Sequence, residues 1–150
     1  MKFQWFQCDT LQYFYNRCFH LDPGFVAPPG YTSIETMRKG IALEGVFNKL
    51  NVDGFFLEYD TPRAGDFTPL RFVPKGRKVV LGLVSTKLPD LETADLLKKR
   101  IDEAARFMPI EQLCLWPQCG FASSARSALS MELVERKLAR IVEVADQVWG

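Results

Sequence analysis

Cys119 and Glu58 are the two residues of this sequence whose types and positions best suit metal chemistry. Cys119 comes after the apolar run Leu113–Trp116 and after Pro117, which ends a strand because proline has no N–H for a sheet ladder. Glu58 directly follows another apolar run, Phe55–Leu57. A thiolate is both a nucleophile and a metal ligand, and Zn²⁺ takes Cys, His and Asp or Glu side chains. If both runs are parallel strands, their carboxyl ends bring a carboxylate and a thiolate together.

Other polar residues stand at the same kind of position. Asp60 comes two residues after Glu58, and Ser85 and Lys87 follow the apolar run 79–84. In parallel α/β folds, functional groups lie at the carboxyl ends of the strands. Two candidate ligands do not complete a catalytic zinc site, however, because such a site normally has three protein ligands and an open position. The alternative for Cys119 is a small apolar residue packed under a loop.

The elements that position these residues follow from hydrophobic periodicity. Continuous apolar runs predict three buried strands: residues 55–57, 79–84 and 113–116. Amphipathic patterns predict three helices: about 32–50, 90–107 and 131–149. The apolar stripe of the last helix recurs at helical spacing: Leu133, Val134, Leu138, Ile141, Val142, Ala145, Val148 and Trp149. Strands that alternate with helices indicate an α/β fold with a parallel sheet and right-handed crossovers.

Residues 1–30 form an irregular, aromatic-rich N-terminal segment without a clean period. Leu11, Phe14, Tyr15 and Cys18 have helical spacing and leave a helix there as an alternative. Pro23-Gly24 and Pro28-Pro29-Gly30 interrupt regular structure. We interpret residues 1–30 as a divergent segment or linker and residues 31–150 as the domain.

The overall composition is that of a soluble globular domain. The chain has 150 residues and a formal net charge of +1, which gives no sign of a nucleic-acid or anionic-membrane partner. No apolar run approaches the roughly 20 residues of a membrane span, and the N-terminus has no secretory signal. The four cysteines do not have the spacing of a disulfide framework, so we expect a cytoplasmic protein with reduced thiols.

Several segments of the sequence carry a resemblance to a known family. They are Val52–Asp60, Arg63–Phe67, Pro69–Pro74, Val79–Val84, Arg100–Ala105, Pro117–Phe121 and Val148–Gly150. Through these segments, the part of the chain from about residue 41 to residue 149 resembles the C-terminal part of the cobalamin-independent methionine synthase family, particularly its short, single-barrel members. The resemblance implies a partial TIM barrel that consists of the last three βα units.

The resemblance also implies an activity. The family transfers a methyl group from a methyl-folate to homocysteine, and its barrel binds one catalytic zinc that holds the homocysteine sulfur as a thiolate. Its ligands are a His-x-Cys pair, a glutamate at the end of a later strand and a cysteine after the last strand. Glu58 and Cys119 fall on the last two positions. Zinc is thus the implied cofactor, with homocysteine and methyl-folate as the implied small-molecule partners.

This sequence departs from the family pattern at the other ligand positions. It contains no His-x-Cys, and its single histidine, His20, lies in the reversed order Cys18-Phe19-His20, farther upstream of Glu58 than in the family. Ser85-Thr86-Lys87 stand near the place of a catalytic histidine in the larger synthases. We therefore expect an incomplete or inactive fragment of such an enzyme, and we assign no catalytic or substrate-binding residue.

Two other functions remain open from the sequence. One is a non-catalytic interaction module that forms a homo-oligomer or completes a barrel with a partner, because a few βα units leave sheet edges open. The other is a barrel relative with another substrate, such as the decarboxylases of related fold, in which Lys87 and Arg63 would bind a carboxylate. The simpler interpretation of these two side chains is that they are loop charges in water.

Overall fold

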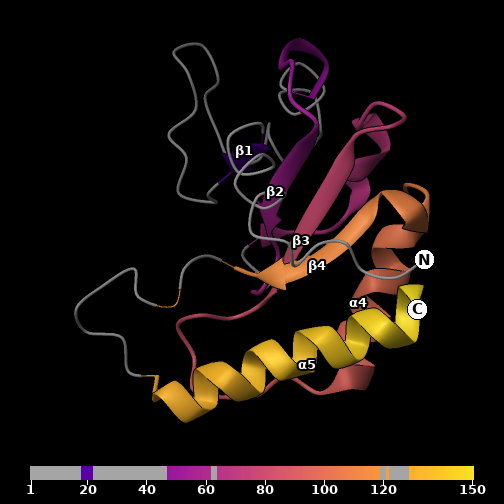
Figure 1. Ribbon diagram of the computed structural model, residues 1–150. Coiled ribbons are helices and arrows are strands. Elements are labelled where there is room, and N and C mark those ends of the chain that lie inside the picture. Colours follow the sequence, from indigo (N-terminus) through magenta and orange to yellow (C-terminus); the bar gives the residue numbers. More distant parts are fainter. Residues whose placement is uncertain (1–17, 22–46, 62–63, 119–120, 122–128) are drawn as a thin grey trace.

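A four-stranded parallel sheet forms the centre of the fold, as the computed structural model in Figure 1 shows. The structure describes residues 18–21, 47–61, 64–118, 121 and 129–150. The sheet order follows the chain: β1 (Cys18–Leu21), β2 (Gly54–Glu58), β3 (Lys78–Val84) and β4 (Leu113–Pro117). The predicted α/β class with parallel strands is confirmed, and each predicted strand agrees with an observed one to within a residue or so at either end.

The strand β1 was not predicted. Cys18–Leu21 pairs with β2 in parallel, with Cys18 opposite Gly54 and Leu21 opposite Leu57. The sheet therefore has one strand more than the three expected, and the helical alternative that included Cys18 is wrong at that residue. The backbone groups at the edge of β2 are available for pairing, and they can recruit a segment that has no strand pattern of its own.

The two faces of the sheet differ in burial. On β2, β3 and β4, one face is buried throughout and contributes these side chains: Phe55, Leu57, Val79, Leu81, Leu83, Leu113 and Leu115. On the other face, Phe56, Glu58, Cys114 and Trp116 are only half-buried. Successive side chains of a strand point to opposite faces, so this alternation follows from the period of two. Among the strands whose side chains are described, only β3 is buried on both faces over nearly its whole length, as its continuous apolar run predicts.

Two long helices, α4 (Ala94–Ala105) and α5 (Met131–Trp149), pack against each other, and α5 also packs against β4. The N-cap of α4 is Thr93, whose side chain accepts a hydrogen bond from the Leu96 N–H at 3.2 Å. The helix thus begins later than the predicted residue 90. Ser130 caps α5 in the same way, through the Leu133 N–H at 3.2 Å. The predicted range of the last helix, 131–149, is confirmed.

The buried stripe of α5 differs from the predicted one at its centre. Lys137 is fully buried together with Ile141, Val144 and Ala145, whereas Leu138 and Val142 are each 41% exposed. A lysine does not count as apolar in a periodicity analysis, although its long stem fills space in a core. Its charge is neutralised by a residue from a distant loop, which is described below.

Two short 3₁₀ helices complete the described part: η3 (Thr68–Phe72) and η4 (Ile110–Gln112). Of the predicted helix at 32–50, only residues 47–49 lie in the described part with helical structure. The division of the chain between residues 30 and 31 stays a prediction. Within the described ranges, no helix combines the length and the apolar character that a membrane span requires.

Candidate functional site

Glu58 ends β2 and lies at the carboxyl edge of the sheet, as predicted. Its carboxylate oxygen Oε2 accepts a hydrogen bond from the Gln118 side-chain Nε2 at 3.1 Å. Gln118 directly follows β4, and its backbone N–H donates to the Val84 carbonyl oxygen at 2.8 Å. The carboxyl ends of β2 and β4 are therefore joined across β3 by one amide side chain.

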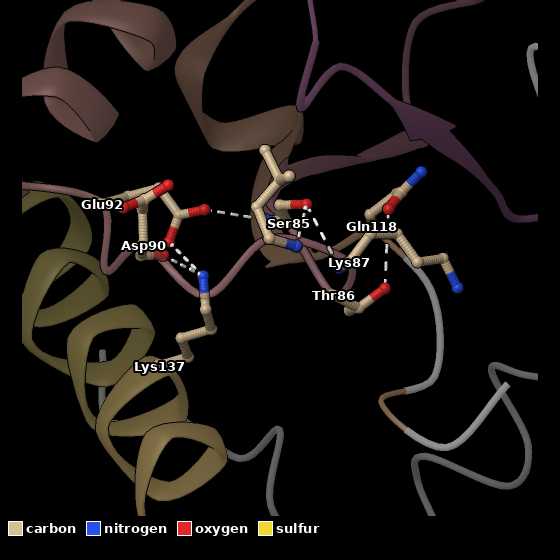
Figure 2. Close-up of polar contacts among 8 residues, drawn as sticks. Ser85, Thr86, Lys87, Asp90, Glu92, Gln118 and Lys137 are labelled. Carbon is tan, nitrogen blue, oxygen red and sulfur yellow. Dashed lines mark hydrogen bonds and ion pairs between the residues drawn. The ribbon is translucent and has the colours of Figure 1, made fainter. Parts of the chain in front are cut away.

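The amide of Gln118 has a second partner on the loop after β3. Its Oε1 lies 3.5 Å from Thr86 Oγ1, which donates to it. The two contacts determine how the amide is oriented, because only the nitrogen donates to a carboxylate and only the oxygen accepts from a hydroxyl. A continuous set of hydrogen bonds thus spans three strand ends, from Thr86 through Gln118 to Glu58 (Figure 2 shows the Thr86 and Gln118 part).

Gly82 provides the space in which this set of hydrogen bonds forms. It lies opposite Glu58 in the pairing of β2 and β3, and the pairing of β3 with β4 shifts register between Gly82 and Val84. A Cβ atom on Gly82 would lie 3.1 Å from the Gln118 Cα and 3.4 Å from the Glu58 Cα. Both neighbours are backbone atoms, so a side chain here would push the two strand ends apart.

Replacing Gly82 with alanine is expected to displace Gln118 from Glu58 and to destabilise the fold by about 1–3 kcal/mol through overpacking. The shift is measured from the carboxamide NMR resonances of Gln118, and the stability from urea denaturation. Gly76→Ala is the control: Gly76 has φ +83° with nothing within 4 Å of an added Cβ, so alanine strains the backbone far from the site. Unchanged Gln118 resonances in Gly82→Ala would contradict the prediction.

The loop after β3 is the third part of this edge. Ser85 and Thr86 are buried, whereas Lys87 is exposed. The Ser85 hydroxyl oxygen accepts hydrogen bonds from the N–H groups of Lys87, at 3.3 Å, and of Leu88, at 3.4 Å. Partial burial raises the pKa of Asp60, and a hydrogen bond from the Ser85 side chain opposes that shift. The structure thus brings Asp60 and Ser85 together beside Glu58, as their strand-end positions predict.

The structure does not describe the side chains of the other predicted ligand, Cys119, and of three further candidates. Cys119 and Arg63 lie outside the described residues, and of Cys18 and His20 only the backbone in β1 is described. The register places His20 opposite Phe56, on the strand next to Glu58. Among the residues that the structure does describe, no three potential ligands form a group that could hold a metal. Glu58 as a ligand therefore stays a prediction, as does Cys119.

Cys114, the cysteine of β4, is unsuited to either metal binding or nucleophilic attack. Burial raises the pKa of its thiol to about 11, and the charge of Lys78 only partly offsets this. The thiol is therefore protonated at neutral pH, whereas the thiolate is the species that binds metals. Cys114 gives a matched reference for any variant of Cys119.

Sequence analysis did not assign a role to Gln118 or Gly82. Gln118 is part of the Pro117–Phe121 segment that carries the resemblance, so its place next to Cys119 was the available signal. Gly82 interrupts an otherwise apolar strand, and an isolated glycine in a strand often marks a close approach of backbones.

Comparison with known proteins identifies the family. The sequence profile described as "Cobalamin-independent synthase, Catalytic domain" matches residues 41–147. Uncharacterized protein YxjG of Bacillus subtilis (strain 168) is 49% identical over 110 residues, which are 72% of this chain and 29% of that protein. Uncharacterized protein YxjH of the same organism is 48% identical over 108 residues, which are 71% of this chain and 29% of that protein.

Solved structures give the same fold. A putative vitamin-B12 independent methionine synthase from Listeria monocytogenes superposes with a TM-score of 0.55 and 27% identity, covering 95% of this chain and 52% of that one. A B12-independent methionine synthase from Shewanella sp. W3-18-1, solved in complex with selenomethionine, has a TM-score of 0.62 and 23% identity. The match covers 87% of this chain and 38% of that one. The fold is thus a part of a TIM barrel, as predicted. The chain spans less than a third of the curated relatives that it matches, and it belongs to the family of the cobalamin-independent synthase catalytic domain.

Proposed function

We propose that the carboxyl edge of this sheet is part of a zinc-dependent site that activates the thiol of homocysteine for methylation by a methyl-folate. The observation that supports it most is the Glu58 carboxylate, held at a strand end by Gln118, the residue directly before Cys119. Ligating carboxylates are typically oriented by an outer hydrogen bond of this kind. The solved relatives, a methionine synthase from Shewanella sp. W3-18-1 and a protein from Listeria monocytogenes named as a putative one, agree with this proposal.

The chemistry of the donors fits the metal. A carboxylate oxygen and a thiolate sulfur are both ordinary zinc ligands, and we propose that Glu58 and Cys119 would hold it. When bound, zinc deprotonates a coordinating thiol and so makes it a nucleophile at neutral pH. The task of Gln118 is to keep Glu58 turned towards the metal, and that of Thr86 is to hold the Gln118 amide.

The ligand set needs at least one more member. The 150 residues contain no His-x-Cys, so we propose that a third ligand comes from His20, from Cys18 or from another polypeptide. A metal site with an incomplete set of ligands binds its metal less tightly, because binding depends on ligand number and geometry. We therefore propose a site that retains two ligand positions without turnover in this polypeptide alone.

Zinc content tests the proposal. Protein purified without chelator is expected to contain zinc. Cys119→Ala and Glu58→Gln are each expected to bind zinc at least about 10-fold to 100-fold more weakly, which is the cost that the loss of an outer-shell partner already has. Cys114→Ala is the matched control, because it removes a protonated thiol from β4 and should leave the zinc content unchanged. Absence of zinc from the parent, or equal zinc in Cys119→Ala, would contradict the metal role.

Self-association stays a prediction. Three apolar side chains of α5 are exposed in the described part of the chain: Met131, Leu138 and Val142. They lie on one side of the helix, because their spacings of seven and four residues are helical. Such a stripe is compatible with a second copy or with another part of a barrel, and it does not distinguish between the two.

A further inference from the structure

Lys137 is an unexpected member of the buried face of α5. Its side chain is 0% exposed, and its ammonium group donates to Glu92 Oε2 at 2.9 Å and to the carbonyl oxygen of Asp90 (Figure 2). A buried charge destabilises a fold unless it is paired and hydrogen-bonded, so Lys137 can be buried only because it makes these two contacts. Both partners belong to the loop between β3 and α4, so Lys137 ties that loop to α5.

Glu92 extends this contact towards the carboxyl edge of the sheet. One carboxylate oxygen, Oε2, accepts from Lys137, and the other, Oε1, accepts from the backbone N–H of Ser85 at 2.8 Å. Ser85 is the first residue after β3. The carboxylate thus connects the middle of α5 to the point where β3 ends, and hydrogen bonds to a charged group are the stronger ones.

The connection continues from Ser85 to Glu58. Thr86, the next residue, donates to the Gln118 amide, and that amide donates to the Glu58 carboxylate. We propose that Lys137 is a positioning residue of the site, because its ammonium group holds the loop after β3, through Glu92 and Ser85, in the conformation that places Thr86 and Gln118 against Glu58. This inference rests on the proposed function only in taking Glu58 as a zinc ligand. The hydrogen bonds that position Glu58 do not depend on that role.

The ion pair of Lys137 with Glu92 orients the loop after β3, which an apolar side chain at position 137 would not do. Methionine in place of Lys137 would fill similar space, but Glu92 would then be a nearly buried carboxylate without a cation. It would turn towards water, and Ser85 would lose its acceptor. Buried ion pairs are often no more stabilising than apolar residues of the same volume, so their use points to geometry rather than to stability.

The test separates positioning from stability with two variants and a control. Lys137→Met removes the ammonium group, and Lys137→Met with Glu92→Gln also removes the unpaired charge while keeping an acceptor for Ser85. Arg136→Met, at the exposed neighbouring position of α5, is the control. The measurements are the thermal midpoint, the hydrogen exchange of the Ser85 amide relative to Leu81 within β3, and the Gln118 carboxamide resonances.

The double variant gives the decisive result. We expect it to melt within about 5 °C of the parent, because no unpaired charge remains. We also expect the Ser85 amide to exchange about 10-fold to 100-fold faster, because its charged acceptor, held by Lys137, is replaced by a neutral amide that nothing holds in place. The Gln118 resonances are expected to be displaced as well. Lys137→Met is expected to show the same changes at Ser85 and Gln118 together with a lower thermal midpoint. Arg136→Met is expected to change neither the midpoint nor these two local signals.

Two outcomes would overturn the proposal. If the double variant has the Ser85 exchange and the Gln118 resonances of the parent, Lys137 only neutralises Glu92. If neither variant melts cooperatively, Lys137 is needed for folding and is not a positioning residue. These measurements require neither zinc nor substrate, so they can fail or succeed independently of the zinc test of the proposed function.

Discussion

Replacing Leu81 with alanine is expected to lower the free energy of unfolding by about 2–5 kcal/mol, the cost of a cavity in a well-packed core. Leu81 is 0% exposed and lies in the middle of β3. Its register partners are Leu57 on β2 and Leu115 on β4, so the deleted atoms contact side chains from both neighbouring strands. Because domains are stable by only about 5–15 kcal/mol, this is a large share of the total.

The matched control is the same substitution at Leu138 of α5, which is 41% exposed. There we expect a change within about 0.5 kcal/mol, since surface substitutions away from special features have small effects. Both values are obtained from urea denaturation followed by circular dichroism. Similar losses at the two positions would mean that Leu138 belongs to the core, as the helical periodicity of the sequence predicts and the structure contradicts.

The second large effect concerns catalysis: the 150-residue polypeptide alone is expected to form no methionine from homocysteine and a methyl-folate. Methyl transfer requires two substrates held in line and close together, and such positioning contributes about 7–11 kcal/mol to lowering a barrier. The described edge supplies polar side chains after only β2, β3 and β4, and the sequence has no His-x-Cys pair. The groups that would position two substrates are therefore incomplete in this polypeptide.

The assay uses the zinc-loaded protein and measures methionine over time. Cys119→Ala gives the background level of methionine. Cys114→Ala is the control, because it makes the same substitution at a cysteine whose thiol is protonated. Methionine in the parent and in Cys114→Ala, at a level above Cys119→Ala, would show that the prediction is wrong and that Cys119 takes part in turnover.

Local pattern was sufficient to predict much of the fold and the position of Glu58. The apolar run at 79–84 became β3, because a strand buried on both faces needs apolar side chains at nearly every position. The run at 113–116 became β4, which is fully buried on one face and half-buried on the other. The helix 131–149 was predicted from its periodicity. Glu58 was placed at the carboxyl edge because it follows an apolar run, and that follows from chain order alone.

Contacts between distant residues decided what the sequence could not. Cys18–Leu21 has no strand pattern, and it is a strand because β2 supplies the backbone partners. Lys137 is buried because Glu92, 45 positions earlier, neutralises it, and no window of helical length contains both.

The candidate site shows the same division. Its carboxylate was visible in the sequence, whereas the Gln118 contact with Glu58 joins residues 60 positions apart and depends on the close approach of backbones that Gly82 allows. Hydrophobic periodicity reports which face of an element is buried, and it contains no information about which polar groups meet. The sequence by itself therefore determined the strands β2, β3 and β4, the helix α5 and the edge that carries Glu58. Only the tertiary structure decided which side chains hold Glu58 in place, because hydrogen bonds and ion pairs depend on distances that folding sets.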